Sequence, residues 1–236
     1  MTDAPENQTT AAIEPATAAP KQVPADPGPG EQFDVRAGKR ERLRAEGWDP
    51  YPVTVPITTT IAAVRAGYGH LGAGAETDDV VGVAGRVVFL RNTGRLCFVT
   101  LADGAGTTLQ AMLSAKSLPT GGHSSLAAFK TDVDLGDHLF IHGHVGCSRR
   151  GELSVFAEPV LRQGADLAGA TDADIEVPAW RIASKALRPL PKTWTNEAGE
   201  AVTLSEEQRV RRRELDLITR PAARDMVNLA DRKSVV

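Results

Sequence analysis

Hydrophobic residues recur at every second position from Val80 onward, which is the spacing of half-buried β-strands. Val81, Val83 and Val87 alternate with glycine, alanine and arginine until the run Arg91-Asn92-Thr93-Gly94, whose composition is that of a hairpin turn. Similar runs predict further strands at 95–101, 107–113, 137–145 and 152–160, and a helical piece around 126–130. The pattern therefore predicts a meander of three strands, a connection that contains a helix, and a closing hairpin.

A different pattern, dense in charge and free of proline, covers residues 31–46 and predicts a basic helix. Gly47 is placed to end that helix in a left-handed conformation, and Pro50 cannot continue it. Residues 53–79 predict only a short helix near 60–66, followed by a loop.

The order of these elements is that of an OB-fold, a five-stranded Greek-key barrel whose second and third strands form a face for oligonucleotides. We therefore predict a mainly β protein with a five-stranded OB-fold Greek-key barrel, an N-terminal helix and a C-terminal helical extension. Trp180 and Ile182 are expected to pack against the barrel. The expected segments are a disordered acidic tail (1–30), a basic helix with the loop that follows it (31–52), the OB-fold domain (80–162), an insertion loop (163–180) and a final linker with helix (181–236).

Charge and composition narrow the class of protein. The 236 residues include 27 Lys or Arg and 30 Asp or Glu, so any positive surface must come from local clustering. Residues 1–30 hold four acidic side chains against Lys21 and no aromatic residue, which predicts a disordered tail. The apolar runs are too short for a membrane span and no secretory signal is visible, so we expect a cytoplasmic protein without a membrane partner. Cys97 and Cys147 lack the spacing of a disulfide framework or zinc ribbon.

Four side chains on the predicted strands have the chemistry needed to bind and read a base. Phe98 offers an aromatic platform, and Gln110 both donates and accepts hydrogen bonds. Arg91 offers a planar donor fork, and Glu152 accepts. Taken singly they are ambiguous, because Phe98 is also a typical core residue and Glu152 a typical solvated strand start. The candidate phosphate contacts, or simply solvated charges, are Arg149 and Arg150 on the predicted hairpin tip and Arg40 and Arg44 on the first helix.

Five separated blocks of sequence favour the base-binding interpretation of these residues. They are Val83-Ala84-Gly85-Arg86-Val87, Phe98-Val99-Thr100-Leu101, Leu109-Gln110, Asp134-Leu135-Gly136-Asp137 and Gly151-Glu152-Leu153-Ser154-Val155. In this order they resemble the anticodon-binding domain of lysyl-tRNA synthetase, and the resemblance extends through Ser184-Lys185-Ala186-Leu187-Arg188-Pro189-Leu190-Pro191. The resemblance implies that the residue matching Phe98 stacks on an anticodon base. It also implies that Arg91, Gln110 and Glu152 hydrogen-bond to anticodon uridines, of which the middle uridine is read most closely. The expected partner is therefore tRNA, of lysine type in its anticodon, with a separate catalytic chain as a further candidate partner.

The chain also departs from that family. It contains neither Phe-Arg-x-Glu nor Gly-x-Gly-x-x-Arg, and Glu214 stands where the family usually has an aromatic residue. We therefore expect no catalytic residue and no cofactor in this chain, although full-length members use ATP and Mg²⁺. Residues 181–236 are expected to be a linker and the truncated start of a class II catalytic domain. No metal site is predicted, because His138, His142 and His144 have no carboxylate or cysteine beside them at ligand spacing.

Three functions remain open on the sequence. The first, which we favour, is a module that binds tRNA and performs no chemistry. The second is a fragment or split part of an active lysine–tRNA ligase, completed by a separate catalytic chain. The third is a degenerate remnant or an OB-fold protein that binds nucleic acid without specificity.

Overall fold

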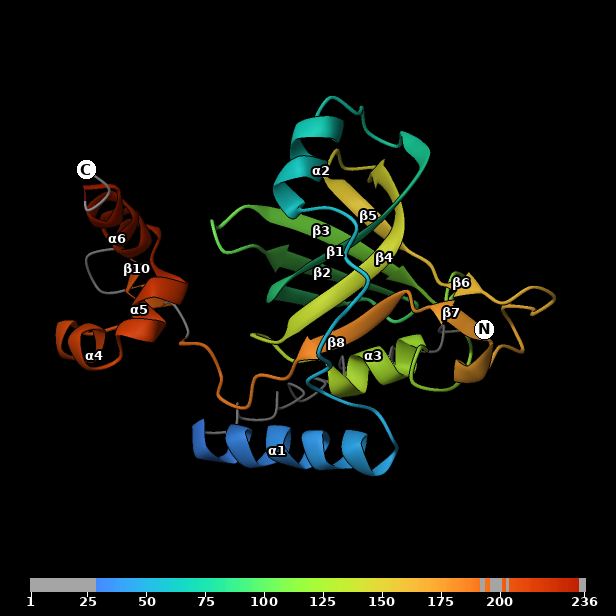
Figure 1. The fold of residues 1–236 in the computed structure, drawn as a ribbon, viewed down its shortest axis with the longest axis horizontal. Helices are drawn as coiled ribbons and strands as arrows, with labels where there is room; N and C mark the ends of the chain where they lie inside the picture. Colours follow the sequence, from blue (N-terminus) through green and yellow to red (C-terminus); the bar gives the residue numbers. More distant parts are fainter. Residues whose placement is uncertain (1–28, 192–193, 196–200, 203, 234–236) are drawn as a thin grey trace, which may run out of the picture.

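Five strands close into a ring in the computed structural model, which describes residues 29–191, 194–195, 201–202 and 204–233 (Figure 1). The strands of this ring are β1 (Glu76–Asn92), β2 (Leu96–Ala102), β3 (Thr108–Ser114), β4 (His138–Cys147) and β5 (Leu153–Ala157). Around the ring, β1 pairs with β2, β2 with β3, β3 with β5, β5 with β4, and β4 again with β1. The β3–β5 pairing is parallel and the others are antiparallel. The predicted OB-fold is confirmed.

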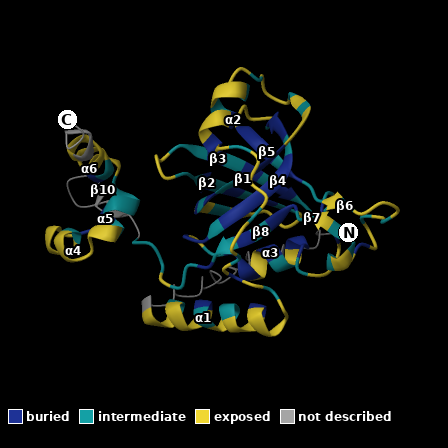
Figure 2. Ribbon diagram, viewed as in Figure 1, coloured by how far each residue is buried: buried dark blue, intermediate teal, exposed yellow. Residues whose placement is uncertain are grey.

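Alternation of side chains builds the core inside this ring. Val83, Val99, Leu113 and Val155, one from each of four strands, are all 0% exposed. Apart from the two exposed ends of β1, these strands appear mainly dark blue or teal in Figure 2, whereas α1 is exposed along much of its length. Gly143 allows β4 and β5 to approach closely, since a Cβ there would lie 1.9 Å from the carbonyl oxygen of Phe156.

Helices cover the two ends of the barrel. The predicted helices exist as α1 (Pro29–Ala45), α2 (Ile61–Tyr68) and α3 (Leu126–Asp132). Gly47, two residues after the end of α1, adopts a φ of +82°, which confirms its predicted role. In Figure 1, α2 and α3 lie at opposite ends of the barrel, and α1 runs below α3.

The structure differs from the predicted segment boundaries. The first strand begins at Glu76 rather than at Val80. A sixth strand, β8 (Trp180–Ser184), pairs with β4 and extends the sheet beyond the expected 80–162. The expected insertion loop contains a 3-10 turn, η1 (Asp172–Asp174), and a short strand, β7 (Ile175–Val177), which pairs with β6 (Val160–Leu161).

The predicted packing of β8 on the barrel is confirmed. Trp180 is 4% exposed and Ile182 is 5% exposed. The Trp180 ring meets the ring of Phe129 edge to face, with 5.2 Å between centroids. Such aromatic pairs favour this geometry, so β8 is held against α3 as well as against β4.

The two ends of the chain differ in what can be described. Residues 1–28 of the predicted disordered tail lie outside the described residues, whereas Pro29 and Gly30 begin α1. The predicted C-terminal helical extension is present to one side of the barrel (Figure 1). It consists of α4 (Glu206–Arg211), α5 (Arg213–Thr219) and α6 (Pro221–Lys233), preceded by the short strands β9 (Trp194–Thr195) and β10 (Ala201–Val202).

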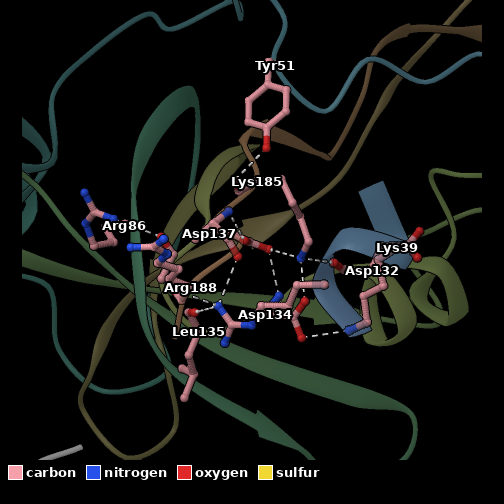
Figure 3. Close-up of polar contacts among 12 residues, drawn as sticks. Lys39, Tyr51, Arg86, Asp132, Asp134, Leu135, Asp137, Lys185 and Arg188 are labelled. Atoms are coloured by element: carbon pink, nitrogen blue, oxygen red, sulfur yellow. Dashed lines mark hydrogen bonds and ion pairs between the residues drawn. The ribbon is translucent and has the colours of Figure 1, made fainter. Parts of the chain in front are cut away.

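A buried ammonium group joins the barrel to the chain that follows it (Figure 3). Lys185, directly after β8, donates from Nζ to the carbonyl oxygen of Asp132 at 2.6 Å, to Asp134 at 2.5 Å and to Asp137 at 2.7 Å. The side chains of Lys185 and Asp137 are both 0% exposed. All three donors of the ammonium are therefore satisfied where α3 leads into β4.

The same junction also binds α1 and the loop after it. Arg36 donates to the carbonyl oxygens of Leu135 at 2.9 Å and Ala186 at 3.1 Å. Lys39 lies 2.7 Å from Asp134, and the Tyr51 hydroxyl donates to the carbonyl oxygen of Lys185 at 3.1 Å. Three distant parts of the chain thus meet around one ammonium group.

The two carboxylates of this cluster differ electrostatically. Burial raises the pKa of the Asp137 carboxyl, although Lys185 acts in the opposite direction. Burial also disfavours the charged form of Asp134, but Lys185 and Lys39 together outweigh it and lower the pKa of that carboxyl. Asp134 is therefore the carboxylate whose charge the cluster stabilises more.

Lys185→Met should destabilise the fold strongly, because it leaves the buried Asp137 carboxylate without its cation. Removal of one partner from a buried ion pair costs about 3–5 kcal/mol, and we expect a loss of that size in the free energy of unfolding measured in urea. Lys116→Met is the matched control, since Lys116 is exposed. Equal stability of the two variants would show that the cluster contributes nothing net.

Candidate nucleic-acid interface

Phe98 lies on the outer face of the barrel and not in its core. Its neighbours Cys97 and Val99 are buried, with exposed fractions of 2% and 0%, whereas Phe98 itself is only partly buried. Strand register places Arg91 opposite Phe98 across β1 and β2, and Met112 opposite Phe98 across β2 and β3. Directly paired residues point to the same face with Cβ atoms about 5 Å apart. The structure therefore brings an exposed arginine beside a partly exposed aromatic ring.

Gln110 occupies the next position along that face. It pairs with Thr100 of β2, which neighbours Phe98 on the same side of the strand. The Gln110 amide donates from Nε2 to Ser154 Oγ at 2.8 Å, and Ser154 Oγ donates to the carbonyl oxygen of Glu152 at 2.9 Å. Because the Ser154 proton is used in this way, its oxygen must accept from Gln110, which assigns the amide orientation. The Gln110 Oε1 acceptor has no partner among the described residues.

Ser154 was not identified as a site residue from the sequence. It is 0% exposed and makes no direct contact with solvent, yet it decides which end of Gln110 faces outward. The resemblance contained it in a matching block but assigned it no role.

Glu152 directly precedes β5 and lies beside the start of β3. There an arginine from α2 forms an ion pair with it. Arg65 donates to Glu152 Oε1 at 2.9 Å and to the carbonyl oxygen of Thr108 at 2.6 Å. The two side chains are 37% and 50% exposed, so this ion pair remains accessible to a ligand. No sequence pattern connects Arg65 with Glu152, because the barrel alone brings them together.

The candidate phosphate contacts fall into two separate places. Arg149 and Arg150 are exposed at the tip of the β4–β5 hairpin, and neither has an ion-pair partner among the described residues. Arg40 and Arg44 lie on α1, where Glu41 is 2.6 Å from Arg40 and 3.9 Å from Arg44. The structure does not bring these two residues to the Phe98 face, since α1 packs along the connection between α3 and β4.

Other features add no second centre of chemistry. Burial raises the pKa of the Cys97 thiol, with Lys130 opposing it, so the thiolate that would act as a nucleophile is disfavoured. In the part of the chain that the structure describes, no three His, Cys, Asp or Glu side chains gather as a metal site would need. Over the same residues, no helix has the length and hydropathy to cross a membrane.

A cleft of about 730 Å³ opens between the barrel and the C-terminal helices. Arg36, Arg86 and Arg224 line it, and none of the predicted base-binding or phosphate-binding residues does. Burial lowers the pKa of the Arg86 guanidinium, which donates to the carbonyl oxygen of Gly136 at 3.0 Å. Arg86 pairs with Ala102, which lies on the same side of β2 as Phe98 and Thr100, so the cleft borders the outer face of β1 and β2 beyond Thr100.

Comparison with known proteins agrees with this geometry. Residues 81–160 match the anticodon-binding family described as an OB-fold nucleic acid binding domain. The Mycobacterium tuberculosis (strain ATCC 25177 / H37Ra) protein named lysine–tRNA ligase is 49% identical over 199 residues, which are 84% of this chain and 34% of that protein. The chain is a relative of the lysine–tRNA ligases, and it contains their OB-fold anticodon-binding domain.

Two further relatives carry the same name. The lysine–tRNA ligase of Kineococcus radiotolerans is 48% identical over 216 residues, covering 89% of this chain and 37% of that protein. That of Synechococcus sp. (strain CC9311) is 34% identical over 195 residues, covering 83% of this chain and 34% of that protein. The predicted resemblance is confirmed, and the chain spans about a third of the length of these relatives.

Ser154→Ala should loosen Gln110 without changing the fold. It removes two hydrogen bonds, each contributing about 0.5–1.5 kcal/mol, so the free energy of unfolding should fall by about 1–3 kcal/mol. The side-chain amide resonances of Gln110 in an NMR spectrum should also shift toward those of a mobile amide. Ser117→Ala, which removes no such hydrogen bond, is the control. Unchanged Gln110 resonances would contradict the assigned orientation.

Proposed function

We propose that this chain binds a lysine-type tRNA, and that the anticodon loop of the tRNA lies on the outer face of β1, β2 and β3. The observation that supports the proposal best is the position of Phe98, partly exposed between the strands that carry Arg91 and Gln110. OB-folds bind single-stranded nucleic acid on this face by stacking bases on aromatic rings. The relatives named lysine–tRNA ligase suggest which tRNA is bound.

The polar groups around Phe98 suit a uridine. A uridine presents an N3–H donor between two carbonyl acceptors. Ser154 turns Gln110 so that Oε1 faces outward, where it can accept from N3–H. Cytidine has an acceptor at N3 instead, which would face Gln110 Oε1 without a proton between them. Arg91 can donate to a uridine carbonyl, and Glu152 can accept from a neighbouring base or ribose hydroxyl.

A second candidate function is participation in aminoacylation. The similarity to lysine–tRNA ligases runs over 89% of this chain for the Kineococcus protein, so it includes residues beyond the barrel. In this case the anticodon-binding domain would act together with a class II domain on a separate chain. Lysylation of tRNA by a chain that carries a class II domain, if it increases when this chain is added, would show participation in aminoacylation, whereas tRNA binding with no such increase would support a binding role alone.

Phe98→Ala should weaken binding of a lysine-type anticodon stem-loop. Loss of one stacked base costs about 1–3 kcal/mol, so the dissociation constant should rise about 5- to 150-fold. A fluorescence anisotropy titration measures this change, and an RNA with its middle uridine replaced by cytidine tests the reading.

Phe33→Ala is the control for this titration, because Phe33 lies on α1, away from the outer face of β2. Discrimination between uridine and cytidine that disappears in Phe98→Ala supports the proposal. Equal binding of both RNAs by the unaltered chain would refute anticodon reading and favour a nonspecific OB-fold protein or a remnant.

Arg149→Ala/Arg150→Ala should weaken binding of all RNAs alike. Phosphate binding makes affinity depend on salt, with a slope near 0.7 per neutralised phosphate on single strands, so the slope should fall by about that amount for each phosphate that is no longer bound. Titrations at several salt concentrations measure the slope. Arg40→Ala/Arg44→Ala is the matched pair, for which we expect a smaller change because Glu41 already pairs with both residues. A larger change in slope for Arg40→Ala/Arg44→Ala than for Arg149→Ala/Arg150→Ala would instead place the RNA along α1.

A further inference from the structure

The outer row that contains Phe98 continues across two more strands. Met112 of β3 pairs with Phe156 of β5, and Phe156 pairs with His144 of β4. Because paired residues share a face, these side chains form one band around the outside of the barrel. In order, the band consists of Arg91, Phe98, Met112, Phe156 and His144.

Phe156 and His144 form a stacked pair at the far end of this band. Their ring centroids are 5.1 Å apart and their planes differ by 4°. Gly146 leaves room for the Phe156 ring, since a Cβ there would lie 2.8 Å from its Cε2 atom. Glu158 Oε1 lies 3.2 Å from His144 Nδ1 and orients the imidazole. These contacts orient both rings before a ligand binds, and preorganisation of this kind reduces the entropy lost on binding.

The surroundings leave this pair open and close the positions beside it. The His144 side chain is 25% exposed and Phe156 is partly exposed. Further along the same side of β4, Phe140 and His142 are only 0% and 8% exposed. The segment before α2 passes over the adjoining part of β1, where the Thr58 amide donates to the carbonyl oxygen of Gly82 at 2.9 Å.

Charge limits the direction in which an RNA strand can run. The start of β1 beside His144 carries Glu76, Asp78 and Asp79, which would repel phosphates. Arg149 and Arg150 stand on the hairpin that joins β4 to β5, and Arg91 stands at the other end of the band. A strand that follows the band from Arg91 would therefore end at His144.

We infer that Phe156 and His144 are a second base-stacking platform, which takes a loop nucleotide flanking the anticodon base on Phe98. Neighbouring strands lie about 4.8 Å apart, so Phe98 and Phe156, two strands apart, are separated by about 10 Å. Successive unstacked nucleotides can span that interval, with Met112 filling the gap between the rings. This inference rests on the proposed function and adds a further contact to it.

The test uses anticodon stem-loops that carry the fluorescent base 2-aminopurine beside the middle uridine, on its 5′ side in one RNA and on its 3′ side in another. The base loses fluorescence when it stacks. We expect saturating protein to quench one of the two RNAs. Phe156→Leu, which keeps the apolar bulk but removes the ring, should abolish that quenching and weaken binding roughly 5-fold or more. It should still discriminate the middle uridine, because Phe98 and Gln110 are unchanged.

Matched variants make the result decisive. Phe33→Leu, the same substitution on α1, should change neither quenching nor affinity. His144→Ala should act like Phe156→Leu, and it replaces that variant if urea unfolding shows that Phe156→Leu does not fold. Quenching at neither position, or full quenching in both platform variants, would overturn the inference. If Phe98→Ala still weakens RNA binding in that case, the proposed function stands. Unchanged affinity of Phe98→Ala would instead refute the proposed function, and this inference with it.

Discussion

The ammonium group of Lys185 is the interaction on which the arrangement of the chain depends. It is fully buried and shared by oxygens of Asp132, Asp134 and Asp137, which run from the end of α3 to the residue before β4. A charge in such a position is tolerated only when every donor is satisfied. The surrounding residues meet that condition, and in doing so they fix where the chain leaves the barrel. The N-terminal helix is attached at the same place through Arg36 and Lys39.

Closure of the barrel has the second largest consequence, because it decides which residues share a face. Pairing of β3 with β5 is parallel and joins strands that are far apart in the sequence. That pairing places Ser154 beside Gln110 and Phe156 beside Met112. One register therefore orients the amide proposed to read a uridine and also extends the aromatic band beyond Phe98.

The outer face combines rigid and accessible groups. Gln110 is tied to Ser154 and Glu152 to Arg65, so neither side chain must be ordered when a ligand binds. Preorganisation of this kind reduces the entropy lost on binding. Arg149 and Arg150 are in contrast exposed on a hairpin tip, which suits contacts to a flexible phosphate backbone. In the proposed function, base reading and phosphate binding therefore belong to different parts of one surface.

The sequence by itself determined the five strands of the barrel, the helices α1 to α3 and the OB-fold, because alternation of side chains and turn chemistry act over a few residues. It also singled out Phe98 and Gln110, whose type and strand position are local properties. Only the tertiary structure decided that Phe98 faces outward, that Arg65 holds Glu152, and that Arg40 and Arg44 lie away from that face. It also decided the partners of Lys185 and the Phe156–His144 pair. These depend on register and on contacts between residues distant in the chain, and no local pattern records which strands become neighbours when the barrel closes.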